Sequence, residues 1–518
     1  MRPRRTLLIA RELRCHNLFV RITNPYLRLL AMTGAAVLVH GYHLGVDDAA
    51  IYVPAVKQVA TPGLYPFGAE FFMSHAHLSL FPALVGGFAR VTGLSSDLVI
   101  FACHVLSIFL LLLAAWRLAC ACFRSDAARW GGVGLLAAAL ATPVAGTALV
   151  IMDPYVTARS FSAPATLFSI AYFLSNRRGP ALLWLLFTAL VHPQMSVFGA
   201  AFLGCMMVAR RLEETPSMPP LLLLGLPFIW SLEPVRGPAR EALLSRTYFF
   251  VSQWTWYEWV GAVAPVALLL WFQHVKLAGV LPPFQRVART MVPFSAMFTA
   301  AAIFLNSTAR LENYTRWQPM RAFHLVYLVF FVLLGGLLAE YFLRARLCRW
   351  VALFVPLATG MHVLARQSFP FSPTVELPGV TAAGNNWMDA FLWIRRNTPQ
   401  NAIFALDPDY MAVPSDDQHG FRALAERSAL ADALKDSGAV SLFPELARRW
   451  KQEVQAQTGW NRFGSRDFEM LSRKYGVTWV IVRRANLADL RCPYRNAELA
   501  VCPLGRSTCE QLMEYRLY

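Results

Sequence analysis

The sequence predicts a mostly α-helical, polytopic membrane protein with a small α/β domain at its C-terminal end. Three observations lead to this prediction. Runs of apolar side chains follow one another from residue 27 to residue 366. Only 15% of the 518 residues are charged, whereas about 25% is usual for soluble domains. From residue 367 onward the composition becomes that of an ordinary soluble protein.

The apolar runs predict about eleven membrane spans, because a spanning helix needs about 20 apolar residues. The stretch 180–209 is interrupted by His192-Pro193 and is interpreted as two short spans that form a hairpin. Residues 75–92 are apolar but contain two His, one Pro, two Gly and one Arg, so we expect an interfacial or re-entrant helix on the outer side. The remaining predicted spans are 27–44, 98–119, 131–151, 156–175, 219–233, 258–273, 288–306, 321–343 and 350–366.

The distribution of charge predicts the topology. Residues 1–366 contain 30 Lys and Arg against 14 Asp and Glu, whereas residues 367–518 contain 18 and 17. A basic surplus between apolar runs indicates the positive-inside rule and argues against a nucleic-acid partner. With the N-terminus in the cytoplasm, the inner segments carry 19 basic residues and the outer segments eight. An odd number of spans then places the C-terminal domain outside. The Ala- and Arg-rich composition suggests a bacterial inner membrane.

The predicted domains are a membrane domain at 1–366, a linker at 367–384 and an extracytoplasmic α/β domain at 385–518. The linker is rich in Pro and Gly. In the last domain, helices are predicted at 386–396, 443–457 and 465–474, and short β-rich runs at 402–406 and 477–482 predict strands. Cys492, Cys502 and Cys509 cluster near the end, and an oxidising compartment leaves one disulfide among them open.

The adjacent carboxylates Asp47 and Asp48 follow the outer end of the first predicted span. Two neighbouring carboxylates at a membrane surface can act as a general base or hold a cation. We therefore expect them to be catalytic. A divalent cation stays open as a cofactor, and Asp47, Asp48 and Asp153 would be its ligands. The alternative is that one Asp only caps the helix that starts near Ala49.

A basic segment at 309–324 is the second candidate. Arg310, Arg316, Gln318 and Arg321 precede a predicted span on the outer side, where positive charge runs against the topology rule. Such a segment can clamp the phosphate of a lipid. The alternative is a solvated loop with an Arg–Glu pair and side chains that extend to the interface.

Single ionisable residues in apolar surroundings complete the set. Arg159 lies inside an apolar run, where charge is costly and often functional. It is a candidate phosphate ligand, and the alternative is a structural ion pair with Asp153. His192 at the hairpin break can contact substrate or bond a freed backbone carbonyl. His77 is included as a substrate contact, although a metal site with His75 lacks a third ligand nearby.

These features together resemble the GT-C superfamily of polytopic glycosyltransferases, which use lipid-linked sugar donors. The resemblance rests on the basic N-terminus, the acidic pair in GYHLGVDDAAIYVPAV and the stretch SHAHLSLFPAL (74–84) in the first outer loop. The broken hairpin at His192-Pro193 and the C-terminal domain are similar as well. The segments IRRNTPQNAIFAL and KYGVTWVIV resemble segments of bacterial members.

The resemblance implies transfer of a sugar from a polyprenyl-phosphate donor to an extracytoplasmic glycan, lipid or protein. Asp47 or Asp48 would be the base, and the phosphate would be held by the candidate residues Arg159, Arg310, Arg316, Gln318, Arg321, His192 and His77. Two other functions stay open: a transporter or flippase of a lipid-linked glycan, and a catalytically silent membrane scaffold.

Overall fold

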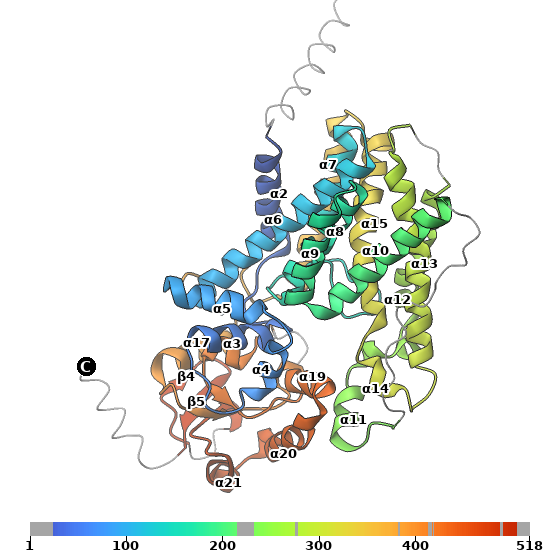
Figure 1. Cartoon of the computed structure of the whole chain (residues 1–518). Helices are drawn as coiled ribbons and strands as arrows, with labels where there is room; N and C mark the ends of the chain where they lie inside the picture. The colour runs from blue at the N-terminus through green and yellow to red at the C-terminus, as the bar shows by residue number, and fades with distance from the viewer. Residues whose placement is uncertain are drawn as a thin grey trace, which may run out of the picture.

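The chain is mostly helical, with one small β-sheet near its C-terminal end, as the sequence predicts (Figure 1). The computed structural model describes residues 24–214, 233–274, 278–381, 384–412, 417, 419–486 and 490–504. A bundle of long helices forms one part of the molecule, and the C-terminal domain lies at one end of that bundle. The helices of the first loop, α3 (Ala49–Ala60), α4 (Glu70–Ala76) and α5 (Phe81–Thr92), lie between these two parts.

The bundle helices match most of the predicted apolar segments. Helix α9 ends at Val191 and α10 starts at Pro193, so the predicted break at His192 is confirmed. The predicted segment 219–233 falls almost entirely outside the described residues. The described bundle helices are α2 (Pro25–His40), α6 (Ser96–Cys122), α7 (Asp126–Ala138), α8 (Ala158–Leu174), α9 (Arg178–Val191), α10 (Pro193–Glu214), α12 (Trp256–Phe272), α13 (Pro282–Leu305), α15 (Phe323–Leu338) and α16 (Leu347–Ser368).

Fewer helices than the eleven predicted are long and apolar enough to cross a membrane. Within the described residues there are four: α6, α13, the segment Glu312–Leu343 and α16. The count becomes five if α4 and α5, which are bent by 100° relative to each other, form one broken span. The shortfall arises because several apolar runs fold into shorter helices. Helix α7, for example, covers only 13 residues of a region in which 131–151 was expected to span.

Small residues allow the central bundle helices α7 and α15 to approach closely. A Cβ atom placed on Gly131 would lie 2.5 Å from the carbonyl oxygen of Gly335, and one on Gly132 would lie 2.6 Å from that of Val332. Such small-residue crossings are typical of helix pairs in membranes. Beyond this crossing the bundle core is filled by Leu, Phe and Val side chains.

The C-terminal domain is built on a sheet with the strand order β2-β1-β3-β5-β4. Strands β1 (Ile403–Ala405), β2 (Ser428–Ala429) and β3 (Trp479–Arg483) are parallel, and β4 (Tyr494–Arg495) and β5 (Leu499–Pro503) add antiparallel edges. The predicted helices and strands of this domain are confirmed. The helices are α17 (Asn386–Asn397), α18 (Phe421–Ala425), α19 (Lys435–Leu442), α20 (Ala447–Gln457) and α21 (Ser465–Tyr475).

One hydrophobic core joins the C-terminal domain to the first loop. Val53 of α3 and Phe81 of α5 belong to the same cluster of buried residues as Phe391 of α17 and Phe404 of β1. The two parts are therefore packed together rather than connected only by the linker. Cys492 and Cys502 form a disulfide on the sheet, and Cys509 lies outside the described residues.

Candidate functional site

The turn that carries Asp47 and Asp48 places both carboxylates at the end of the bundle. Asp47 has φ +46°, a left-handed conformation that Asp tolerates better than most residues. Asp48 occupies the position before the first residue of α3, as the capping alternative predicts, but its side chain makes no capping hydrogen bond. The location of the helix start was therefore correct, whereas the expected cap is absent.

The two carboxylates have different partners. Asp47 forms an ion pair with Lys435 and accepts a hydrogen bond from the Tyr155 hydroxyl at 3.1 Å. Asp48 lies 3.9 Å from the Arg159 guanidinium, and its side chain is 37% exposed. Among the described residues, none donates a hydrogen bond to the Asp48 carboxylate. Asp48 is thus the carboxylate with free lone pairs.

Positive groups keep Asp48 ionised. Burial would raise the pKa of this carboxyl, but Lys435, Arg159 and Arg321 together hold the pKa below its usual value. The neighbouring Asp153 behaves in the opposite way, because burial raises its pKa despite the opposing effect of Arg159. Arg159 Nη2 and Asp153 Oδ2 are 2.6 Å apart and both side chains are buried, so the predicted ion pair is present. Arg159 nevertheless also faces Asp48.

Arg321 is the cation of the site without a carboxylate partner. It lies two residues before α15, within the 3-10 turn Pro319–Ala322. Its guanidinium lies 5.8 Å from the ring centre of Tyr248, and its buried Nε atom has no hydrogen-bond partner. Within the described part of the chain, no carboxylate lies close enough to form an ion pair with Arg321. An anion could therefore bind there without displacing an existing partner.

Three histidines from separate helices surround these charges. His75 of α4 interacts electrostatically with Asp48 and Arg321. His192, at the break between α9 and α10, interacts electrostatically with Arg159, Arg321 and the other two histidines. His324 of α15 contacts the Ile151 carbonyl oxygen through Nε2 at 2.9 Å. The structure thus places His192 at the site as expected.

His77 was expected at the site, and the structure places His75 there instead. His77 is exposed and is the residue that ends α4. Residues two apart point about 200° apart around a helix, so only one of the pair can face Asp48. The sequence pattern contained the correct histidine but did not identify which of the two turns inward.

The remaining residues of the basic segment do not join Arg321. Arg310 is exposed. Arg316 donates a hydrogen bond to the Leu442 carbonyl at 3.3 Å, which connects it to α19. Gln318 is buried with φ +48° and donates to the Arg316 carbonyl at 3.3 Å. The Arg–Glu pair of the alternative does exist, but Glu312 pairs with Arg240 of α11 (Gly237–Leu244) at 3.0 Å.

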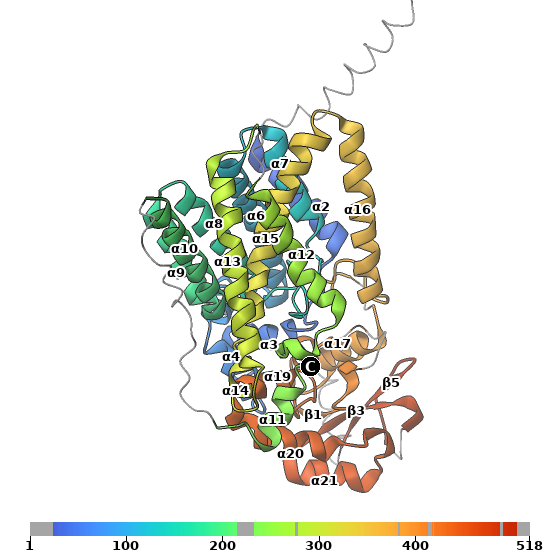
Figure 2. The same ribbon diagram turned by 90° about the vertical axis from the view of Figure 1, so that its right-hand side faces the viewer.

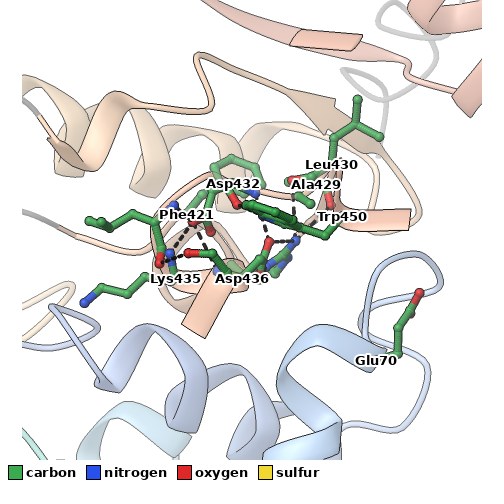
Figure 3. A network of polar contacts seen from close by, with 12 residues as sticks. Glu70, Phe421, Ala429, Leu430, Asp432, Lys435, Asp436 and Trp450 are labelled. Carbon is green, nitrogen blue, oxygen red and sulfur yellow. Dashed lines mark hydrogen bonds and ion pairs between the residues drawn. The ribbon is translucent and has the colours of Figure 1, made fainter. Parts of the chain in front are cut away.

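The C-terminal domain supplies Lys435, which sequence reasoning missed. Lys435 is the first residue of α19, and its side chain extends away from Asp432 and Asp436 (Figure 3). The Asp432 carboxylate accepts from the backbone nitrogen of Leu434 at 2.9 Å and also from that of Lys435, and so holds the start of this helix. Burial, aided by Asp436, raises the pKa of Asp432 to about 7.

A second ion pair fixes the same turn. The Arg422 guanidinium donates to both oxygens of Asp436, at 2.8 and 3.0 Å. The same guanidinium donates to the Ala429 and Leu430 carbonyls at 3.2 and 3.4 Å, so the pair lies at the carboxyl end of β2, the edge at which α/β sheets usually place functional groups. Here that edge faces the first loop of the bundle, which explains why Lys435 reaches Asp47.

The described residues contain no group of three or more His, Cys, Asp or Glu that could hold a metal ion. Asp47 and Asp153, two of the three carboxylates considered for a cation, are already paired with Lys435 and Arg159.

The sequence matches no protein-family model, and no curated protein is significantly similar to it. Function must consequently be inferred from the site itself.

Proposed function

We propose that the chain is a membrane glycosyltransferase that moves a sugar from a polyprenyl-phosphate donor to an acceptor hydroxyl of a glycan, lipid or protein. The observation that carries this proposal is that Asp48 lies 3.9 Å from Arg159 and also interacts electrostatically with Arg321. An ionised carboxylate with free lone pairs next to a guanidinium without a carboxylate partner fits a base beside a phosphate site.

In the proposed reaction, the acceptor oxygen attacks the anomeric carbon of the donor sugar. Asp48 takes the proton of the acceptor hydroxyl while the new carbon–oxygen bond forms. The bond between the anomeric carbon and the phosphate oxygen breaks, and polyprenyl phosphate leaves with the electron pair. Arg321 and Arg159 would stabilise the negative charge that develops on that oxygen. Asp47, held by Lys435 and Tyr155, would orient the acceptor.

An apolar groove beside the site suits a prenyl tail. It has a volume of about 470 Å³ and lies between α6, α8 and α9. Phe161, which lines it, is two residues after Arg159 on α8, so the groove begins at the same level of this helix as the phosphate site but on another side of it. Apart from backbone atoms the lining is apolar: Leu110, Phe161, Pro164, Ala165, Pro180, Leu183, Trp184 and Phe187.

Exposed apolar helix faces support a bundle embedded in lipid. Helix α16 has no buried residue and lies at the outside of the bundle (Figure 2). Val351 and Val355 on α16 are 50% and 57% exposed, and Leu182 and Leu183 on α9 are 66% and 67% exposed. Continuous apolar surface of this kind is unusual for a soluble monomer. We propose that α2, α9 and α12, which are shorter apolar helices, add spans to the four long ones.

The proposed orientation keeps the N-terminus in the cytoplasm of a bacterium and the site on the outer side of its inner membrane. The basic residues between the inner ends of the predicted spans support this orientation. A transporter or a silent scaffold would share the membrane bundle but would not turn over the donor.

Donor turnover tests the proposal. The purified full chain, in proteoliposomes with a synthetic polyprenyl-phosphate hexose, should release polyprenyl phosphate, and Asp48→Asn should lower the rate about 10²- to 10⁴-fold. Asp47→Asn should be affected less. Unchanged turnover in Asp48→Asn would remove the proposed base. Movement of the intact donor across the bilayer without turnover would favour the transporter instead.

A further inference from the structure

Glu376 lies fully buried between two histidines in the segment that links the bundle to the C-terminal domain. Its Oε2 atom is 2.8 Å from His419 Nε2, and its Oε1 atom is 3.2 Å from His43 Nδ1. The exposed fraction of the Glu376 side chain is 0%, and those of His419 and His43 are 0% and 3%. A buried carboxylate is costly unless it is paired. The His419 contact is a hydrogen bond, whereas the His43 contact is a close approach of opposite polarity without hydrogen-bond geometry.

The three residues join three separate parts of the chain by backbone pairing. The Tyr42 nitrogen donates to the Thr374 carbonyl and the Glu376 nitrogen donates to the Tyr42 carbonyl, both at 2.8 Å. On the other side, the Gly420 nitrogen donates to the Gly45 carbonyl at 2.8 Å. The segment 41–46 is therefore held between the linker and the C-terminal domain.

A glycine permits this close approach. Gly41 has φ +81°, and a Cβ atom there would lie 2.7 Å from the Thr374 carbonyl oxygen. A larger residue would push the linker away from the segment 41–46.

The segment 41–46 is connected to both groups of acidic residues in the site, the Asp47-Asp48 turn and Asp153. Asp47 follows its last residue in the chain. The backbone nitrogen of His43 donates to the Pro154 carbonyl at 2.7 Å, and Pro154 is next to Asp153, the partner of Arg159. A shift of this segment would therefore move the Asp47-Asp48 turn and the Asp153–Arg159 pair together.

We propose that Glu376 is a positioning residue that, by bridging His43 and His419, sets the Asp47-Asp48 turn against Arg159. The mechanism rests on the proposed function, since the groups it positions are the base and the phosphate ligands. The C-terminal domain then belongs to the catalytic unit, because it supplies both His419 and Lys435.

The contacts of Glu376 with His43 and His419, here called the bridge, depend on pH because all three side chains can titrate. Burial opposes the ionised form, but His419 and His43 outweigh it and lower the pKa of Glu376 to about 2. For His419, burial lowers the pKa, but Glu376 and Asp417 raise it above its usual value. The other titratable or polar groups that face the bridge are Tyr42 on the segment 41–46, His104 on α6 and Asn385 before α17.

The sign of the pH dependence follows from these shifts. A histidine with a raised pKa stabilises the folded state fully below its unfolded pKa of about 6.5, and this contribution is lost as pH rises through the folded pKa. The carboxylate contributes above its unfolded pKa of about 4.5 and loses its effect only near pH 2. The bridge is therefore strongest between about pH 4.5 and 6.5 and weakens toward alkaline pH.

The experiment compares the purified full chain with Glu376→Gln, using thermal unfolding from pH 5.5 to 9 and the affinity for farnesyl phosphate as a short prenyl-phosphate probe. Glu376→Gln should lower the melting temperature at pH 6, flatten its pH dependence and weaken farnesyl phosphate binding about tenfold. Glu469→Gln, an exposed residue of α21 that pairs with Arg473, should behave as wild type in both assays.

A second variant covers the case in which Glu376→Gln does not fold. His419→Gln can still donate to Glu376 but cannot titrate, so it should bind farnesyl phosphate within about threefold of wild type and should lose the pH slope. Wild-type pH dependence in either folded variant, or wild-type affinity in folded Glu376→Gln, would overturn the proposal. If wild type does not bind farnesyl phosphate but the variants lose the pH slope, the proposed function fails and the bridge stands.

Discussion

Two clusters of charged residues connect the first loop to the C-terminal domain, and they differ in how completely their charges are paired. In one cluster, Lys57 of α3 pairs with Asp97 at 2.7 Å and with Glu426 at 2.8 Å. Arg395 of α17 pairs with the same two carboxylates at 2.7 and 2.9 Å. The other cluster is the site around Asp48, where Arg321 has no carboxylate partner in the described residues and Asp48 accepts no hydrogen bond from them.

The difference separates a structural role from a binding role. In the Lys57 cluster every charge faces an opposite charge, and the Lys57 side chain is only 2% exposed, so the ion pairs satisfy one another. In the Asp48 cluster the two carboxylates of the turn are 37% and 51% exposed. Charges that remain unpaired in a folded protein cost stability, and such costs are usually associated with function.

The largest expected effect on stability comes from removing a charge from the Lys57 cluster. Lys57→Met would leave the buried Asp97 and the partly exposed Glu426 with one cation instead of two, and should destabilise the protein by about 3–5 kcal/mol. Denaturant unfolding of the purified chain would measure this loss. Arg473→Met, which breaks an exposed pair on α21, is the control and should leave stability unchanged. Equal stability of Lys57→Met and wild type would show that the Lys57 cluster does not stabilise the contact between the first loop and the C-terminal domain.

Substitutions in the Asp48 cluster should change ligand affinity rather than protein stability. Arg321→Gln removes a guanidinium without a carboxylate partner, so the melting temperature should not fall. The affinity for farnesyl phosphate should decrease about 10- to 100-fold, because a hydrogen bond to a charged group contributes about 1.5–3 kcal/mol. Arg310→Gln should bind as wild type does, since Arg310 is exposed and lies apart from the site. Equal losses in the two variants would indicate nonspecific attraction by the basic segment.

Lys435→Met tests the contribution of the C-terminal domain and should have a smaller effect. Asp47 is half exposed, so solvent screens its ion pair with Lys435 and stability should change little. Donor turnover should fall about three- to tenfold, because Asp47 would no longer be held in place. Lys451→Met, whose ion pair with Glu241 lies at the surface, is the matched control. Turnover at the wild-type rate in Lys435→Met would show that Lys435 of the C-terminal domain does not contribute to the site.

Helix positions and the acidic turn could be predicted from the sequence because both depend on local patterns. Apolar periodicity located the helices, and the position of Asp47 and Asp48 after the first apolar run brought them to the site. Within the described residues fewer helices than predicted are long enough to span, because apolar composition does not show where a helix ends. Residues 139–157, for example, are not helical; they connect α7 to α8 and contain Asp153.

The residues that prediction missed depend on tertiary contacts. Lys435 is 388 positions from Asp47 and lies in an ordinary polar segment, so no local signal connects the two. Arg310, Arg316 and Arg321 are indistinguishable by composition, but of the three only Arg321 lies in the turn directly before α15 and interacts electrostatically with Asp48. Glu376 was hidden in a linker that was expected to be a simple connection. Its two histidine partners come from segments before and after it in the chain.

The most direct test of the central claim, that Asp48 and Arg321 share one phosphate-binding pocket, is the affinity of Asp48→Asn for farnesyl phosphate at neutral pH. Removal of a negative charge beside the bound phosphate should increase the affinity severalfold, while donor turnover is lost. Asp126→Asn, an exposed residue at the start of α7, should leave the affinity unchanged. An affinity of Asp48→Asn equal to or weaker than that of wild type would contradict a shared pocket.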